Sequence, residues 1–319
     1  MTSTPTLPDL PDLPASPAST ILTTSHVPAA TPPSTIATSR AFTHRLRVRW
    51  AEVDMQRIVF NANYLLYLDV AITEYWRALA LPYVEAMHLL GGEFYLKKAT
   101  LEYHASAVAD DLLEVSLVCT RMGSSSMQMA GAVKRGDATL VSGELVYVFA
   151  DPAVQKSRPM PAALRELIHA HAAGEPLVTL QVGTWAELGE AAGAVRTEVF
   201  VQEQGIPKEL EWDAADAMAV HALVSNRLGQ PVATGRLLWE SAGVGRIGRM
   251  AVKKGLRGTR VGRTVLDALV KASADRGDRE VLLHAQTSAE GFYLRAGFVP
   301  RGGVYQEAGI PHIEMFKSL

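Results

Sequence analysis

The chain has 319 residues, of which 48% are hydrophobic and 20% are charged, and its formal net charge at pH 7 is −2. This length suits two globular domains, each large enough for its own core, and the near-zero charge excludes a field that would collect nucleic acid. The single cysteine, Cys119, excludes an internal disulfide framework, and its apolar neighbours predict a buried thiol in a reducing compartment.

Residues 1–40 differ from the rest of the chain, being rich in proline, serine and threonine and nearly free of aromatic side chains. Such a segment cannot bury enough apolar surface to offset its ordering entropy, so we expect a disordered tail. It has one arginine, Arg40, and no basic stretch followed by an apolar one, so neither a secretory signal nor a transit peptide is expected. No run reaches the roughly 18 apolar residues that span a bilayer, and we expect a cytoplasmic protein.

The next segment, residues 41–172, predicts one buried helix among antiparallel strands. Residues 45–50 alternate polar and apolar side chains, as a half-buried strand does. Residues 64–81 are apolar nearly all round at helical spacing, which is typical of a buried helix, and Asn61 is the expected N-cap. Four strand-like runs follow, at residues 94–104, 112–121, 126–134 and 139–149. The predicted fold is an antiparallel sheet curved around a central helix, the hotdog architecture.

The stretch before this helix carries a family resemblance. Val48-Arg-Trp-Ala-Glu-Val-Asp54, followed by Ile58-Val-Phe and Ala62-Asn63-Tyr64, resembles the active-site segment of the 4-hydroxybenzoyl-CoA thioesterases, a group that includes the Tol-Pal-associated acyl-CoA thioesterases. The resemblance extends through Gly123-Ser-Ser and Arg158-Pro-Met-Pro161. The family commonly has Gly where this chain has Arg57, and His or Tyr where it has Asn61.

Thioester hydrolysis needs a carboxylate, to attack the carbonyl or to activate water, and donors for the oxyanion. Asp54 is the candidate carboxylate, and the first-turn amides near Asn61 are the candidate donors. The resemblance implies that Asn63 orients the site. It also implies a homo-oligomer through this domain, because hotdog sheets pair edge to edge and a second chain would supply part of the site. The alternative is that Asp54 only caps a turn.

A helix is predicted for residues 161–171, ending at Gly174, and Glu175-Pro176 marks a domain boundary. We therefore expect a linker at residues 173–177 and a second domain over residues 178–319. His169 and His171 are two apart on this helix and point to different faces, so they make poor co-ligands, and no metal site is predicted.

Helices alternate with strands in the second domain, which is typical of a mixed α/β sheet. An amphipathic helix covers residues 185–199, and strand-like runs follow at residues 220–224, 232–239, 246–252, 281–286 and 311–316. Gly243-Val-Gly245-Arg-Ile-Gly248 satisfies the G-x-G-x-x-G pattern. A dinucleotide site needs a strand before these glycines and a helix after them, whereas here they lead into a strand, so we reject a nicotinamide cofactor.

Residues 249–270 predict a strand, a turn and a helix that together hold a diphosphate. Met250, Ala251 and Val252 form the strand end, and the turn is Arg257-Gly258-Thr259-Arg260-Val261-Gly262. Helical spacing of apolar side chains begins directly after it. Backbone amides at a helix N-terminus and the positive end of its dipole favour phosphate oxygens, and the glycines let a ligand approach the backbone.

The segment Gln286-Thr-Ser-Ala-Glu-Gly-Phe292-Tyr293-Leu-Arg-Ala-Gly297-Phe298 resembles the second half of the GNAT acetyltransferase signature. The turn resembles that family's acetyl-CoA loop, with Arg260 in place of the usual middle glycine. Residues 199–207 and 309–315 are similar to one GNAT subgroup of unassigned substrate.

This resemblance implies acetyl-CoA as a substrate, Gln286 on the pantetheine arm, and Tyr293 as the acid that protonates the departing thiolate. The acceptor amine stays open. So does the base that takes its proton, for which Glu203, His284 and His312 are candidates. A strand histidine such as His284 is more often a hydrogen-bonded core residue.

Two interpretations of the whole chain are open. The first is a bifunctional CoA-dependent enzyme, with an acyl-CoA thioesterase domain and an N-acetyltransferase domain. The second is a CoA-ester-binding sensor or scaffold in which one or both domains have lost turnover. Arg57 and Arg260, each replacing a usual glycine beside a site, keep the second interpretation open.

Overall fold

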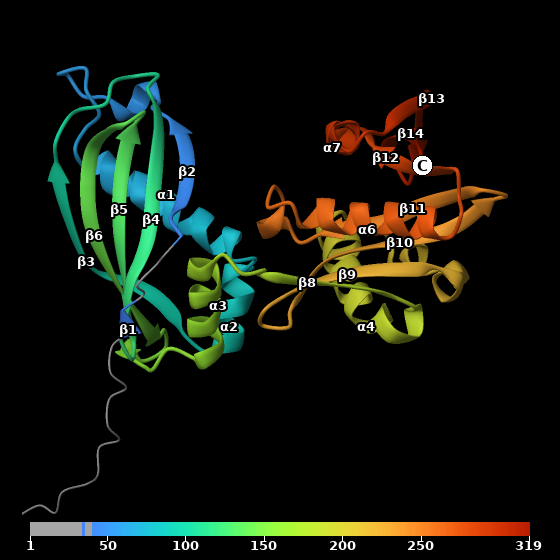
Figure 1. Cartoon of the computed structure of the whole chain (residues 1–319), viewed down its shortest axis with the longest axis horizontal. Coiled ribbons are helices and arrows are strands. Elements are labelled where there is room, and N and C mark those ends of the chain that lie inside the picture. The colour runs from blue at the N-terminus through green and yellow to red at the C-terminus, as the bar shows by residue number, and fades with distance from the viewer. Residues whose placement is uncertain (1–33, 36–39) are drawn as a thin grey trace, which may run out of the picture. The chain divides into compact units, whose positions relative to one another are not determined.

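The computed structural model describes residues 34–35 and 40–319 (Figure 1). Most of the predicted disordered tail therefore lies outside the described residues. Ser34–Thr35 forms a short strand, β1, paired with a later strand, contrary to the disorder predicted for those two residues. The described residues form two domains, one built on an antiparallel sheet and the other on a mixed sheet.

All pairings in the N-terminal sheet are antiparallel, and its long strands follow the order β4-β5-β6-β3 (Figure 1). The four runs predicted after the first helix are confirmed as strands. The first predicted strand begins and ends earlier than expected, because Trp50 belongs to the short helix η1 (Trp50–Glu52). The strands are β2 (Phe42–Arg47), β3 (Glu93–Tyr103), β4 (Leu112–Met122), β5 (Ser126–Arg135), β6 (Ala138–Asp151) and β7 (Lys156–Ser157).

Helix α1 (Ala62–Ala78) buries one face against this sheet. Its buried side chains include Tyr67, Leu68 and Tyr75, and they join the core formed by β4, β5 and β6. A Cβ on Gly131 of β5 would lie 2.6 Å from Leu68 Cδ2, so glycine allows the close packing. Burial all round the helix was the wrong expectation, since Leu66 is 46% exposed.

Two further helices complete this domain. Helix α2 (Tyr83–Leu90), which the sequence pattern did not predict, ends at Gly91 with φ 67°. Helix α3 (Ala162–Ala173) ends, as predicted, at Gly174, whose φ of 73° is the left-handed conformation that glycine adopts readily. Cys119 is buried as expected, and burial raises the pKa of its thiol to about 12.

The C-terminal sheet has the order β13-β14-β12-β11-β10-β9-β8. Only β11 and β12 pair in parallel; the other pairings among these strands are antiparallel. The five predicted strands are confirmed, and β8 and β13 were not predicted. The strands are β8 (Val178–Gly183), β9 (Val220–Asn226), β10 (Pro231–Ser241), β11 (Val244–Val252), β12 (Glu280–Gln286), β13 (Val299–Glu307) and β14 (Ile310–Ser318).

Helices α4 (Trp185–Arg196) and α6 (Val261–Asp275) cover opposite faces of this sheet (Figure 1). A π-helical segment, η2 (Thr197–Glu203), continues α4. The remaining pieces are α5 (Lys208–Glu211), η3 (Ala214–Met218), η4 (Lys254–Leu256), η5 (Thr287–Ala289) and α7 (Glu290–Arg295). Gly245 and Gly248 lie within β11, as predicted, and not in a turn that opens a helix.

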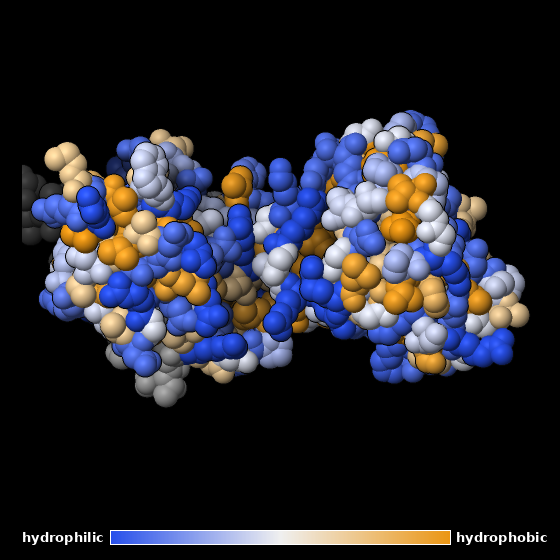
Figure 2. All heavy atoms as spheres, turned by 90° about the horizontal axis from the view of Figure 1, so that it is seen from above, coloured by the Kyte–Doolittle hydropathy of each residue, from blue (hydrophilic) through white to orange (hydrophobic). Residues whose placement is uncertain are grey.

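Hydrophilic side chains cover most of the surface seen in Figure 2, and hydrophobic ones form scattered patches. None of the described helices combines the length and apolarity that crossing a membrane requires.

Candidate active sites

The parallel pair β11 and β12 separates part of the way along. Its register runs only from Val244–Glu280 to Ile247–Leu283, whereas β11 continues to Val252 and β12 to Gln286. The backbone edges beyond this point are not paired with each other. A cavity of about 590 Å³ lies at this place and is lined by Met250, Gln286 and Tyr293 among others. Of the predicted CoA-binding strand end, Met250 lines the cavity, and Ala251 is buried.

A bulge in β11 accompanies the separation. Arg249 has φ 51°, and the β10–β11 register shifts between Thr234 and Arg236. The Arg249 side chain reaches α5 and the loop after it: Nη2 donates to Leu210 O of α5 at 3.1 Å and lies 3.3 Å from Asp213 Oδ2 of the loop. Within the part of the chain that the structure describes, its buried Nε has no hydrogen-bond partner, although it is 3.4 Å from Glu211 Oε2. The contact between Arg249 Nε and Glu211 Oε2 is therefore an ion pair without the geometry of a hydrogen bond.

The predicted diphosphate loop opens α6. Gly258 has φ 86°, and Arg260, the N-cap, has φ 73°. Arg260 therefore holds the left-handed backbone that glycine favours, and its side chain is exposed. The first bond into the helix runs from Thr264 N to Arg260 O at 3.1 Å, so the amides of residues 261–263 stay available to a ligand.

The start of α6 lies against the end of β11. A Cβ on Gly262 would come within 3.0 Å of Val252 Cγ2, which places the open amides beside the separated strand. Thr259 turns inward, its hydroxyl donating to Leu256 O at 2.6 Å. Val261 is buried in the core. Because these two side chains point inward, the loop exposes its backbone amides at this place.

Arg257 is already paired in this structure. Its two Nη atoms lie 2.6 Å from the two carboxylate oxygens of Glu203, and its Nε donates to Val252 O at 3.2 Å. The hydrogen bond from Arg257 lowers the pKa of Glu203 more than burial raises it. A diphosphate that used the Arg257 guanidinium would have to compete with Glu203.

Tyr293 of α7 forms part of the cavity wall and is 8% exposed. Its ring packs edge-on against Phe292 and Phe298, at centroid distances of 5.0 Å and 6.0 Å. Burial raises the pKa of Tyr293 to about 12, so its hydroxyl carries a proton at neutral pH.

The three candidate bases lie in different surroundings. His284 and His312 line the cavity, whereas Glu203 does not. His284 is exposed, so the expectation of a core histidine was wrong, but its Nδ1 does bond to the Tyr305 hydroxyl. His312 Nδ1 is 2.8 Å from Ile310 O. Gln286 Nε2 donates to Gln204 Oε1 at 3.1 Å.

A buried ionic network that sequence reasoning missed adjoins the cavity. Asp216 accepts from Arg196 Nη1 at 2.8 Å and from Arg236 Nη1 at 2.7 Å. Arg236 also pairs with Asp213 at 2.7 Å, and Arg196 pairs with Glu211. Hydrogen bonding to Arg236 lowers the pKa of Asp213, whereas burial raises the pKa of Glu211. These residues are scattered through the sequence without a motif, so no pattern could have found the network.

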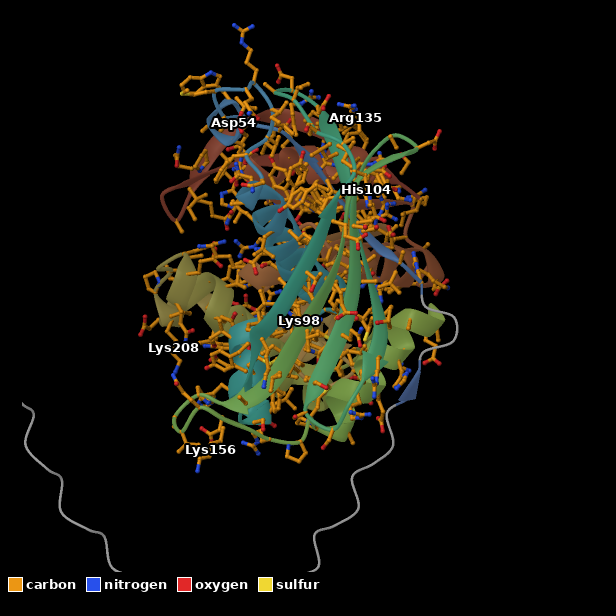
Figure 3. The ribbon with its side chains drawn as sticks, turned by 90° about the vertical axis from the view of Figure 1, so that its left-hand side faces the viewer. Asp54, Lys98, His104, Arg135, Lys156 and Lys208 are labelled. Atoms are coloured by element: carbon orange, nitrogen blue, oxygen red, sulfur yellow. The ribbon has the colours of Figure 1, made fainter. Side chains whose placement is uncertain are left out.

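In the N-terminal domain, Asp54 lies in a turn before α1. Its Oδ1 accepts from Gln56 N at 2.8 Å, and its backbone oxygen accepts from Arg57 N at 2.9 Å. Arg57 has φ 62°, again the conformation that glycine favours, and its side chain is exposed. Figure 3 shows Asp54 at the same end of the sheet as Arg135, with Lys156 at the opposite end.

Asn61 occupies the N-cap position of α1, as predicted, but its side chain makes no capping hydrogen bond among the described residues, contrary to the role expected for it. Its φ of −51° and ψ of −36° are already helical, which turns the side chain away from the first-turn amides. The amides of Asn63 and Tyr64 bond to Phe60 O and Asn61 O, at 2.9 Å and 3.3 Å. Within the described residues, the amides of Asn61 and Ala62 have no such partner.

Glu52, which sequence reasoning also missed, fixes the turn to α1. Its backbone oxygen accepts from Asn63 Nδ2 at 2.8 Å and from Phe60 N at 3.0 Å. Its buried carboxylate accepts from Tyr67 Oη and from Arg49 N, both at 2.8 Å. Burial favours the neutral acid, but these hydrogen bonds outweigh it and lower the pKa of Glu52.

Comparisons with known proteins match both domains. Residues 187–319 match the acetyltransferase (GNAT) domain, and residues 56–142 match the thioesterase superfamily. Asp54 lies just before the second match. The uncharacterised N-acetyltransferase YjcF of Bacillus subtilis is 40% identical over 125 residues, which cover 39% of this chain and 88% of YjcF.

Two solved structures illustrate the two likenesses. An acyl-CoA N-acyltransferase from Pseudomonas aeruginosa is 32% identical, over 44% of this chain and 99% of that one, with a TM-score of 0.41. A probable thioesterase from Bartonella henselae is 19% identical, over 38% of this chain and 100% of that one, with a TM-score of 0.36. This chain belongs to the GNAT acetyltransferase family through residues 187–319 and carries a thioesterase-superfamily hotdog domain that includes residues 56–142.

Proposed function

We propose that the chain is a bifunctional CoA-thioester enzyme: the C-terminal domain transfers an acetyl group from acetyl-CoA to an amine, and the N-terminal domain hydrolyses acyl-CoA. The observation that carries the proposal is the separation of β11 from β12 beyond Ile247, beside the open amides that begin α6. A CoA thioester needs a cationic or amide-lined place for its diphosphate and an edge along which its amide-bearing arm can extend.

For acetyl transfer, the diphosphate would lie on the amides of residues 261–263 and the pantetheine arm along the free edge of Met250 to Val252, with Gln286 opposite. The acceptor nitrogen attacks the thioester carbonyl, and the C–S bond then breaks. Tyr293 protonates the departing sulfur, since its raised pKa keeps its hydroxyl protonated until the thiolate forms.

For hydrolysis, Asp54 would act on the thioester or on water, and the amides of Asn61 and Ala62 would receive the oxyanion. Asn63 and Glu52 hold the turn that brings these groups to one end of α1. We propose a hotdog arrangement wrapped around α1, and a homo-oligomer in which β3 pairs with a second copy. β3 is an edge strand that pairs only with β6, and most of its residues are exposed.

A panel of acyl-CoAs, with and without a panel of primary amines, tests the proposal through the release of free thiol. We expect thiol release without an amine from the thioesterase and an amine-dependent increase with acetyl-CoA. Tyr293→Phe should lower kcat for transfer about 10²-fold, the usual scale of acid catalysis, with the acetyl-CoA Kd unchanged by calorimetry. Tyr95→Phe, at an exposed tyrosine of β3, serves as the matched control.

One observation favours a second candidate, a CoA-ester sensor without turnover. Asp54 caps its own turn through Gln56 N, and Arg57 stands beside it, so the carboxylate has a structural role independent of chemistry. Binding of acyl-CoA without any thiol release, in the full chain, would support the sensor and contradict the enzyme.

A further inference from the structure

His284 lies where the two strands of the candidate acetyl-CoA site part. Leu283 is the last residue of β12 in register with β11, so His284 is the first residue on the free edge. Val281, Leu283 and Ala285 are buried in the core, and the alternation of the strand puts His284 on the opposite face. It is exposed there and lines the same cavity as Tyr293.

The thioester would lie where the separation between β11 and β12 begins, next to Ile247 and Leu283. The diphosphate position at the start of α6 is next to Val252, at the open end of β11. An arm that extends from there along the free edge of β11 runs back towards Gly248 and Ile247, where the strands meet. Adjacent strands are about 4.8 Å apart, so a residue on β12 at that point is within reach of the reacting carbon.

Tyr305 of β13 fixes the His284 ring. The Tyr305 hydroxyl bonds to His284 Nδ1, and the two rings meet edge-on at a centroid distance of 5.9 Å. Tyr305 also stacks on His312, at 6.2 Å and an interplanar angle of 27°. With Nδ1 engaged, Nε2 is the ring nitrogen left for a ligand.

We propose that His284 is the general base that takes the proton of the acceptor ammonium, and that Tyr305 is its positioning residue. The inference rests on the proposed acetyl transfer and identifies a group that the sequence left open. It requires His284 Nδ1–H to donate to Tyr305 Oη, which leaves the Nε2 lone pair to accept the proton. The same hydrogen bond persists when the ring becomes an imidazolium.

Acetyl transfer removes two protons from the acceptor ammonium. His284 Nε2 takes one of them and later loses it to solvent, and the lone pair freed on the acceptor nitrogen forms the C–N bond with the thioester carbon. The C–S bond breaks as the sulfur takes the Tyr293 proton. The second proton leaving the nitrogen restores the Tyr293 hydroxyl, so each turnover releases one proton and one CoA thiol.

The other candidates are less suited. Glu203 is bound by Arg257 and does not line the cavity. His312 lies one strand further from the gap, since β14 pairs with β12 and His312 stands opposite Gln286. Its Nδ1 bonds to the carbonyl of Ile310 in its own strand.

Several charged or titratable groups surround the His284 ring. Glu314 is its cross-strand neighbour on β14, and Arg301 of β13 pairs with Glu314 at 2.5 Å. The other such groups on the neighbouring strands and in the cavity wall are Glu307, His312, Arg246, Arg249, Arg236, Asp213, Glu211 and Tyr293. The Glu314 charge is therefore largely neutralised, and the acid limb of a rate profile should follow the imidazole.

The test uses the full chain, acetyl-CoA and the amine from the panel that gives the highest turnover. We expect His284→Gln to lower kcat about 10²-fold while the acetyl-CoA Kd changes less than about twofold. The acid limb of kcat/KM against pH should disappear in this variant. Tyr305→Phe should keep that limb but move its midpoint down, because the imidazolium loses an acceptor. Added imidazole should partly rescue His284→Ala.

His312→Gln is the discriminating variant, and His88→Gln, at an exposed histidine of α2, is the control. An unchanged profile for His284→Gln, or loss of the acid limb in His312→Gln alone, overturns the assignment while acetyl transfer itself stands. If the unaltered chain acetylates no amine of the panel, the proposed function falls, and the base with it.

Discussion

Asp54 has a measurable role whether or not the N-terminal domain is an enzyme, because its carboxylate holds the turn before α1. If it also acts on the thioester, Asp54→Ala should lower kcat for acyl-CoA hydrolysis by about 10² or more. Asp137→Ala, in the exposed turn between β5 and β6, is the control for a lost surface carboxylate. A hydrolysis rate equal to that of the unaltered chain would remove Asp54 from the mechanism.

If the diphosphate of the proposed ligand uses Arg257, Glu203 competes with it for the guanidinium. The ion pair is exposed, and pairs of this kind contribute up to about 1 kcal/mol, or roughly fivefold in a binding constant. Glu203→Gln should therefore tighten acetyl-CoA binding by up to about fivefold in calorimetry. Glu209→Gln, at an exposed position of α5, should leave the Kd unchanged. Weaker binding in Glu203→Gln would mean that the carboxylate helps to form the site.

Asp216 shows how the elements around the cavity are held. It joins η3 to α4 through Arg196 and to β10 through Arg236. Removing its charge leaves two buried guanidinium groups short of a partner, so Asp216→Asn should lower the free energy of unfolding by about 3–5 kcal/mol. Asp267→Asn, in an exposed pair on α6, should cost about 0.5 kcal/mol or less in the same denaturant titration.

The free energy of unfolding that Asp216 contributes depends on pH in a definite direction. Hydrogen bonds from Arg196 and Arg236 outweigh burial and lower the pKa of Asp216 in the folded chain. Its contribution is therefore complete above the ordinary carboxyl pKa of about 4 and is lost as the pH falls through the lowered value. The stability difference between Asp216→Asn and the unaltered chain should shrink below pH 4. A difference that grew on acidification would contradict the assignment.

The strands with the clearest alternation of buried and less buried side chains were predicted, whereas β8 and β13, which lack one, were missed. β4, β5 and β6 alternate buried and less buried side chains, and α1 has a buried stripe, so periodicity revealed them. Every residue of β13 is exposed, and β8 is an edge strand with mostly exposed residues. Their backbone pairing is set by neighbouring strands rather than by their own side chains.

The site residues likewise divide into those that the sequence predicted and those that it did not. Gln286 and Tyr293 were predicted from motif resemblance and Met250 from the strand, turn and helix pattern, and all three line one cavity. Glu52 and the Arg196–Asp216 network were not predicted, because their partners are distant in sequence and each residue alone is unremarkable in its local pattern. Contacts of this kind become visible only when the chain is folded.

At the scale of the whole molecule, the described residues have two main hydrophobic cores, one in each domain. We therefore expect the two activities to be separable by substitution. Asp54→Ala should abolish amine-independent hydrolysis and keep amine-dependent acetyl transfer, and Tyr293→Phe should do the reverse, with thiol release measured in both assays. Parallel loss of both activities in either variant would show that one site serves both reactions.

Arg57 and Arg260 each stand where the family usually has glycine, and each has a left-handed backbone, which glycine favours. In the proposed sites the ligands bind the backbone amides of residues 261–263 and of Asn61 and Ala62, so a change of side chain at either arginine position leaves those amides in place. Asparagine and aspartate tolerate this conformation better than other non-glycine residues, whereas β-branched residues do not. Relatives with Asn or Asp at these two positions should therefore keep the same turn conformation. A search pattern that demands glycine there would leave such relatives out.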